Sequence, residues 1–352
     1  MLVLVVIALI IVGVLNRSPK SDNLRVGAIL ILSGEAASWG EAAQRGIEMA
    51  RTDFEQAHGI KIEIIFEDSQ GQAKTALSAF QKLTTLDKVD GIIGPLFQTE
   101  VAAISAGVAD AGIPVITPSY APIKNRPNPR NPLMLWMDPT IEAERIAEFV
   151  FGQGVKTVGI IGTLDSWETE VSNAFADKFT ALGGTVLEKQ IVLPDVNDVR
   201  LPITKIVTLK PEAIFVGTYY QFVNSIKVIR ELGYTGKLYS IEVDPYLAGE
   251  TKGNSDGMVF IAPDFYGDAF VDDFESRYGE KPGIPAGQAY DAAMLLFDLL
   301  DESRDKGVVL QKMEDLDKYE GVSGEITFTE NHKTLLPTAL FELRDGEATK
   351  IK

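Results

Sequence analysis

Side chains that could do chemistry are unevenly represented in this sequence. The chain has 50 Asp and Glu residues, two histidines (His58 and His332) and no cysteine. The lack of cysteine excludes thiolate nucleophiles, disulfides, cysteine zinc sites, iron–sulfur clusters and a lipidated-cysteine anchor. Two isolated histidines do not form a metal-ligand pattern. We therefore expect no metal and no cofactor, and carboxylates are the main reactive groups left.

No enzyme motif is present to use those carboxylates. The sequence lacks a P-loop, a Gly-x-Gly-x-x-Gly fingerprint, a Gly-x-Ser-x-Gly elbow and a His-Glu-x-x-His helix. Segment 321–324 (Gly-Val-Ser-Gly) is only superficially similar to a serine motif, because it precedes a late strand as a turn. Asp272 and Asp273 fall on a polar helix face, which favours solvated charge over a catalytic dyad. No local signature in the sequence therefore supports enzyme chemistry, and we expect no enzyme activity.

Length and charge narrow the class of protein further. A chain of 352 residues with 45% hydrophobic residues can form two α/β domains, each with its own core. The sequence has 33 Lys and Arg residues and 50 Asp and Glu residues, so the formal net charge is −17. Such a surface repels phosphate backbones, so we expect no nucleic-acid partner.

The N-terminal segment 1–23 predicts a signal or anchor followed by a short linker. Its apolar run 2–15 suits a signal-peptide core and is shorter than the roughly 20 residues that span a bilayer. No basic residue precedes the run, no Ala-x-Ala site follows it, and Arg17 and Lys20 lie after it. By the positive-inside rule alone, Arg17 and Lys20 would keep the following domain in the cytoplasm. We interpret the run as part of an uncleaved anchor whose basic leader lies upstream of this sequence, with a buried strand as the alternative. We expect an extracytoplasmic, membrane-anchored protein.

Apolar runs alternate with amphipathic stretches along the rest of the chain. Strands are expected at 26–32, 60–66, 91–94, 113–117, 157–161, 186–192, 213–216, 237–240, 324–328 and 340–343. Helices are expected at 41–57, 73–86, 99–111, 140–151, 168–182, 199–209, 221–232, 267–278 and 286–303. This βα rhythm is typical of doubly wound sheets, and its restart after a Pro-rich loop at 125–132 predicts two lobes. Ligands of such sheets bind outside the carboxyl ends of the strands.

Six segments in that order carry a family resemblance. They are 32–40 (Leu-Ser-Gly-Glu-Ala-Ala-Ser-Trp-Gly), 94–99 (Gly-Pro-Leu-Phe-Gln-Thr), 111–119 (Ala-Gly-Ile-Pro-Val-Ile-Thr-Pro-Ser), 217–220 (Gly-Thr-Tyr-Tyr), Glu242 and 289–292 (Ala-Tyr-Asp-Ala). Together they resemble type I periplasmic binding proteins, specifically the leucine/isoleucine/valine-binding branch of ABC transporter substrate-binding proteins. The resemblance implies two Rossmann-like lobes joined by crossing linkers, with lobe 1 at 24–137 plus 265–321 and lobe 2 at 138–264 plus 322–352. The linkers would lie near 136–139, 262–265 and 321–324.

In lobe 1 the resemblance implies a site for the α-carboxylate of an amino acid. The matching positions are Gln98 and Thr99, which open a helix, and Ser119 and Ala121, which follow a strand. Helix N-termini favour anions through unpaired N–H groups and the positive dipole end. Gln98 and Ala121 stand where family members often have hydroxyl residues, which leaves the ligand's head group open. Thr99 could also act only as a helix N-cap.

In lobe 2 the resemblance implies a carboxylate for the α-ammonium. Glu242 matches that position, and a carboxylate enclosed with an ammonium makes a charge-assisted hydrogen bond. Asp244 is the reserve candidate, and a surface-loop role is the alternative for Glu242.

Aromatic side chains are implied to line the ligand site. Trp39, Trp167 and Tyr219 match such positions. Aromatic side chains suit a ligand site because they provide a large, stiff apolar surface together with an N–H or O–H group that can form a hydrogen bond. Core packing is the alternative for each of them. Tyr290 and Trp136 are weaker candidates that we expect to serve packing, Trp136 near a hinge.

The resemblance implies a monomeric protein that captures a small, branched-chain amino acid by lobe closure and delivers it to an ABC permease. Two alternatives stay open: a sensory receptor module of the same fold, or a ligand such as an amide, urea or an aromatic acid, since fold alone does not fix function.

Overall fold

The computed structural model describes residues 23–34, 36–121, 130–264, 267–329 and 333–351. These residues form two compact units. The first contains the described residues of 1–118, 122–133 and 288–315, and the second those of 119–121, 134–287 and 316–352. The predicted N-terminal anchor at 1–22 and residues 125–129 of the predicted loop lie outside the described residues.

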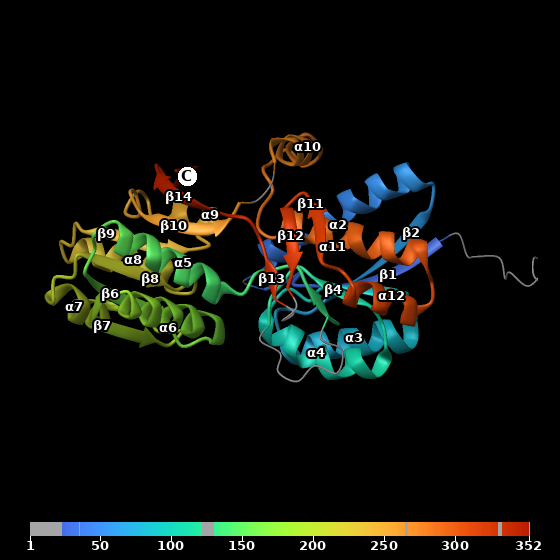
Figure 1. The fold of residues 1–352 in the computed structure, drawn as a ribbon, viewed down its shortest axis with the longest axis horizontal. Helices are drawn as coiled ribbons and strands as arrows, with labels where there is room; N and C mark the ends of the chain where they lie inside the picture. The colour runs from blue at the N-terminus through green and yellow to red at the C-terminus, as the bar shows by residue number, and fades with distance from the viewer. Residues whose placement is uncertain (1–22, 35, 122–129, 265–266, 330–332, 352) are drawn as a thin grey trace, which may run out of the picture. The chain divides into compact units, whose positions relative to one another are not determined.

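A mostly parallel sheet organises the first unit (Figure 1). Its order is β2-β1-β3-β4-β5, with β1 (Asn23–Leu30), β2 (Lys61–Asp68), β3 (Gly91–Ile93), β4 (Val115–Thr117) and β5 (Leu133–Met134). The strands β1 to β4 pair in parallel. Residues 26–30 of β1 are all apolar apart from one glycine, as expected for a strand covered on both faces.

Helices cover both faces of this first sheet. They are α2 (Ala37–His58), α3 (Ala73–Lys82) continued by the π-turn η1 (Leu83–Asp87), α4 (Gln98–Ala111), α11 (Ala286–Glu302) and α12 (Lys306–Glu314). On β3, Ile92 packs in a core cluster with Ile104 of α4, whereas a side chain at Gly91 would meet Leu296 of α11. Phe54 of α2 contacts Phe297 of α11 at a centroid distance of 5.5 Å, so α2 and α11 share the second face.

The second unit contains a larger sheet and a small one. The larger sheet has the order β15-β14-β10-β9-β8-β6-β7, and the small one the order β11-β12-β13. The strands are β6 (Thr157–Thr163), β7 (Thr185–Val192), β8 (Ala213–Gly217), β9 (Lys237–Ile241), β10 (Val259–Pro263), β11 (Lys318–Gly321), β12 (Gly324–Phe328), β13 (Thr334–Leu335), β14 (Thr338–Arg344) and β15 (Glu347–Lys350). In the larger sheet β14 pairs antiparallel with both β10 and β15, whereas β6 to β10 pair in parallel.

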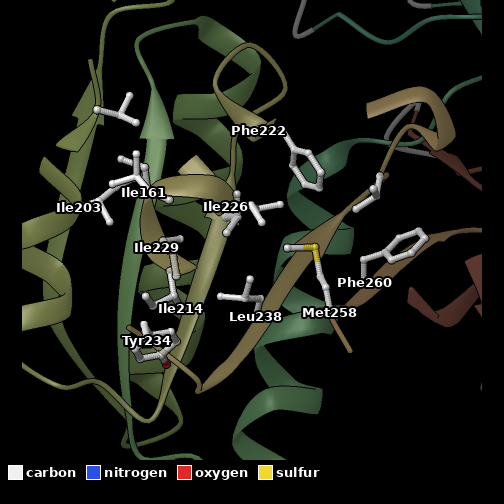
Figure 2. Packing of buried hydrophobic residues seen from close by; sticks show 14 of the residues in the cluster. Ile161, Ile203, Ile214, Phe222, Ile226, Ile229, Tyr234, Leu238, Met258 and Phe260 are labelled. Atoms are coloured by element: carbon white, nitrogen blue, oxygen red, sulfur yellow. The ribbon is translucent and has the colours of Figure 1, made fainter. Parts of the chain in front are cut away.

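Alternate residues of the central strands build two separate cores in this unit. The helices are α5 (Pro139–Gly152), α6 (Ser166–Ala181), α7 (Arg200–Thr208), α8 (Phe222–Glu231), α9 (Pro245–Glu250) and α10 (Asp268–Tyr278). On β8, Ile214 packs with residues of α7 and α8, and Phe215 packs with residues of α5 and α6. Figure 2 shows the first of these cores, in which Ile203 and Ile226 lie near Ile161. The period of two explains why these strands appear in the sequence as continuous apolar runs.

The structure confirms the predicted α/β fold with helix-flanked parallel sheets, and it differs from the prediction in detail. Segment 321–324, predicted to be a linker, is the turn of a hairpin in which Gly321 pairs with Gly324. Ala262 and Pro263, expected in another linker, belong to β10 and pair with β14. Among the described residues, no helix combines the length and apolarity needed to cross a bilayer.

Candidate functional site

The loop after β1 is held against the end of β2. The Asp68 carboxylate accepts the backbone N–H of Leu32 at 2.9 Å and the hydroxyl of Ser33 at 2.6 Å. Burial acts to raise the pKa of Asp68, but hydrogen bonds from Ser33, Gln70 and Leu32 outweigh it and lower that pKa. The loop that leads to Trp39 is therefore fixed at its base by a charged acceptor.

Gly40 allows the first turn of α2 to approach β1 closely. A Cβ at this position would lie 1.8 Å from the carbonyl oxygen of Ile31. We expect Gly40→Ala to lower the free energy of unfolding by about 1–3 kcal/mol, because the backbone must shift. Chemical denaturation measures the loss. The matched control is Gly152→Ala at the end of α5, where nothing lies within 4 Å of the added methyl group. An equal loss in both variants would show that the close approach of Gly40 to Ile31 does not matter for stability.

Trp39 lies beside the start of α4. Its ring contacts that of Phe97 edge-on at 6.1 Å, and Phe97 is the residue that precedes α4. The Glu100 carboxylate accepts the backbone N–H of Phe97 at 2.9 Å and fixes this helix start. Gln98 and Thr99, the first two residues of α4, are thus brought near Trp39 in the first unit. The first N–H groups of a helix are donors suited to an anion.

Ser119 and Ala121 make local hydrogen bonds. Both are buried, and both belong to the second unit. The Ser119 hydroxyl is 3.4 Å from the carbonyl oxygen of Tyr120, which is a weak contact. The backbone N–H of Ala121 donates to the Met134 sulfur at 3.1 Å. Ala121 therefore has no side-chain donor, and its backbone donor is already engaged.

Three loops at one edge of the second sheet carry the other predicted residues. Trp167, Tyr219 and Glu242 follow β6, β8 and β9, which are neighbouring parallel strands. Their carboxyl ends therefore meet at one edge. Trp167 is partly buried in the first turn of α6, and its ring packs against the core between α5, α6 and the sheet.

Glu168 links two of these loops and was not anticipated from the sequence. It is 1% exposed, and one carboxylate oxygen accepts the backbone N–H groups of Tyr219 at 2.7 Å and Tyr220 at 3.2 Å. Burial raises the pKa of Glu168, although hydrogen bonds from the surrounding loop partly oppose this. Glu168 thus fixes the backbone conformation of the loop that contains Tyr219.

We expect Glu168→Leu to lower the free energy of unfolding by about 1–3 kcal/mol, because two N–H groups lose their acceptor. Glu168→Gln keeps an oxygen at that position and should lose less. Urea denaturation of both variants measures the two losses of unfolding free energy. Equal losses would show that the hydrogen bonds to Tyr219 and Tyr220 contribute nothing.

Glu242 lies in a constrained backbone position directly after β9. Its φ of 44° is in the left-handed region, and its N–H donates to the carbonyl oxygen of Ile261 at 2.8 Å. Non-glycine residues in this region are uncommon and cluster at functional sites. The Trp136 indole Nε1–H donates to the Glu242 Oε1 atom at 2.7 Å. Trp136, expected to serve hinge packing, thus holds the predicted ligand carboxylate.

A second buried glutamate contacts Glu242. Glu142, in the first turn of α5, has no exposed surface, and its carboxyl lies within hydrogen-bonding range of the Glu242 carboxyl. Burial raises the pKa of Glu142 well above its usual range, and the negative charge of Glu242 raises it further. Burial also raises the pKa of Glu242, partly opposed by hydrogen bonds from Glu142 and Trp136.

The reserve candidate Asp244 and the weaker candidate Tyr290 both have structural partners. Asp244 caps α9, because its carboxylate accepts the N–H groups of Tyr246 at 2.8 Å and Leu247 at 3.2 Å. The Tyr290 hydroxyl donates to Asp53 of α2 at 3.1 Å, in keeping with packing. Within the described ranges, no group of three or more His, Cys, Asp or Glu side chains could hold a metal ion.

Known proteins provide a comparison for this arrangement. A curated relative, the Leu/Ile/Val-binding protein homolog 3 of Brucella melitensis, is 23% identical over 203 residues. That alignment covers 56% of this chain and 55% of the relative, so the match spans about half of each protein.

Solved structures share the fold over nearly the whole chain. The branched-chain amino acid transporter substrate-binding protein LivJ of Streptococcus pneumoniae, solved with isoleucine, has a TM-score of 0.83 at 21% identity. It covers 93% of this chain and 99% of its own. A solute-binding protein of an ABC transporter from R. palustris, solved with benzoate, has a TM-score of 0.76 at 20% identity and covers 94% and 95%. Residues 23–348 match the family described as periplasmic binding protein, and this chain belongs to that family.

Proposed function

We propose that this protein is an extracytoplasmic solute-binding protein that captures a small, branched-chain amino acid and delivers it to an ABC permease. The observation that carries the proposal is Glu242, a carboxylate held by Trp136 at the carboxyl edge of a parallel sheet. A ligand ammonium would form a charge-assisted hydrogen bond with it. Family membership supports the extracytoplasmic location. The Leu/Ile/Val-binding relative and the isoleucine-bound neighbour support the ligand class.

The proposal assigns the ligand's other groups to the remaining predicted residues. Thr99 and the N–H groups at the start of α4 are candidates for the α-carboxylate, together with Ser119. Trp39 and Tyr219 are candidates for the side chain of the ligand, since both are partly buried aromatics at sheet edges. Trp167 shares that assignment, although its ring also packs on the core. The capture mechanism is the lobe closure that the resemblance implies.

A second ligand class, aromatic acids, is favoured by two observations. Gln98 and Ala121 stand at positions where an amino-acid head group would gain from hydroxyl donors, and the Ala121 N–H is bound to Met134. One neighbour of the same fold was solved with benzoate. An aromatic acid would need the carboxylate site and the aromatic residues, but it would leave Glu242 without a cationic partner.

A thermal-shift screen tests the proposal. The protein would be heated with single amino acids, amides, urea and aromatic acids, each in large excess. A ligand of the folded state at 100 times its dissociation constant adds about 2.7 kcal/mol of stability. A raised midpoint with leucine, isoleucine or valine supports the amino-acid function. A raised midpoint only with compounds that lack an ammonium group would replace it with the second class.

A further inference from the structure

The pair formed by Glu142 and Glu242 has too few hydrogen-bond donors for two ionised carboxylates. Glu142 is fully buried, and within the described chain no N–H or O–H group donates to either of its carboxylate oxygens. Its carboxyl nevertheless lies at hydrogen-bonding range from that of Glu242. Two ionised carboxylates at such a separation repel each other, so a stable contact requires a shared proton.

The neighbouring groups indicate which carboxyl carries the proton. Glu242 accepts the Trp136 indole N–H and therefore has a donor that stabilises its ionised form. Glu142 has no comparable donor, which favours its neutral form. A protonated Glu142 can donate its O–H to the Glu242 carboxylate, giving Glu242 two donors.

Other charged groups near Glu142 belong to α5 and the segment that precedes it. Asp138 caps α5 by accepting the Thr140 N–H at 3.0 Å, pairs with Lys333 at 3.4 Å, and raises the pKa of Glu142. The positive charge of Arg145 acts in the opposite direction, and that side chain donates to the Thr338 hydroxyl at 2.7 Å. Their opposing effects leave burial and Glu242 as the main influences on the protonation of Glu142.

We propose that Glu142 is a positioning residue of the ligand site: protonated, it donates a hydrogen bond to Glu242 and orients that carboxylate toward a cationic group of the ligand. This inference rests on the proposed function for the identity of the ligand group. The hydrogen-bonded pair of Glu142 and Glu242 retains one negative charge, which only a cation compensates. The pair therefore makes the site selective for compounds with an ammonium group.

Infrared spectroscopy of the ligand-free protein tests the protonation state directly. The wild type at neutral pH should show a carboxylic acid C=O band that is absent from Glu142→Gln, visible in the difference spectrum of the two. The substitution is conservative, because a carboxamide N–H can replace the acid O–H as donor to Glu242. A difference spectrum without this band would overturn the inference.

Ligand affinity separates positioning from packing. With L-leucine as the probe in calorimetry, we expect Glu142→Gln to bind within about threefold of the wild type, whereas Glu142→Leu should bind at least about tenfold more weakly, as for the loss of one charge-assisted hydrogen bond. Equal affinities of the two variants would remove Glu142 from the site. If the acid band is present but no amino acid binds the wild type, the proposed function fails while the Glu142–Glu242 hydrogen bond stands.

Stability against pH provides a readout that simple packing would not change. A glutamate titrates near pH 4.3 in an unfolded chain, and the folded pKa of Glu142 is raised. Its protonation therefore stabilises the fold fully below about pH 4.3, and this contribution is lost as pH rises through the folded pKa. Relative to Glu142→Gln, the wild type should lose free energy of unfolding as the pH rises above about 4.3, the pKa of a glutamate in the unfolded chain. Parallel curves for the two proteins would contradict the proposal.

Discussion

Replacing Glu242 with glutamine should weaken amino-acid binding by at least about 25-fold while the protein stays folded. Removing one member of a buried, hydrogen-bonded charge pair costs about 2–5 kcal/mol of binding free energy, and each 1.4 kcal/mol is tenfold in affinity. The neutral amide still accepts the Trp136 N–H but cannot compensate the ligand's ammonium. Calorimetry with L-leucine or L-isoleucine measures the loss.

Asp244→Asn is the matched control for that variant. It removes the same unit of charge two residues away, and asparagine remains a good helix N-cap for α9. We expect its affinity to equal that of the wild type. If both variants lost affinity equally, the effect would be one of overall charge, and Glu242 would not be a ligand contact.

Phe215→Ala should produce the largest loss of stability from a single core substitution. Phe215 has no exposed surface and stacks on Phe175 of α6, with ring centroids 4.0 Å apart and planes 7° apart. Truncating a buried Phe to Ala costs about 3–5 kcal/mol through lost burial and the cavity that remains. Chemical denaturation should show a lower midpoint with an unchanged slope.

Tyr246→Ala provides the comparison for an exposed aromatic residue. Tyr246 is 74% exposed, so its removal should change the free energy of unfolding by less than about 0.5 kcal/mol. A loss below 1 kcal/mol for Phe215→Ala would mean that the α5–α6 side of the sheet is not a close-packed core.

The strands that lie at the centre of each sheet were the most predictable elements. β6 and β8 are covered by helices on both faces, so every residue except Thr157 is buried and the apolar run marks the strand. β10 was not predicted from the sequence: it is only five residues long and ends in proline, and its last two residues fall in the segment 262–265 that was expected to be a linker. α12 was missed because only Val309 and Met313 are buried along it, which gives too little apolar periodicity.

The buried acids of the site were the least predictable feature. Glu142 lies on the same helix stripe as Ile146 and Val150, and Glu168 lies on the same stripe as Val171 and Phe175. An acid on an otherwise apolar stripe with helical spacing was the available signal, since buried acids need a partner. The partners could not be predicted, because they are distant in the sequence: Tyr219 is 51 residues from Glu168, and Trp136 is 106 residues from Glu242, the neighbour of Glu142.

The central claim is that Glu242 receives the ammonium group of an amino-acid ligand. The most direct test is a pair of calorimetric titrations of the wild-type protein, one with L-leucine and one with 4-methylpentanoate, which is the same molecule without its amino group. We expect leucine to bind and the deaminated analogue to bind at least about 25-fold more weakly, which corresponds to the lower bound of the 2–5 kcal/mol expected for losing the charge pair. Equal affinities, or binding of the analogue alone, would contradict this claim.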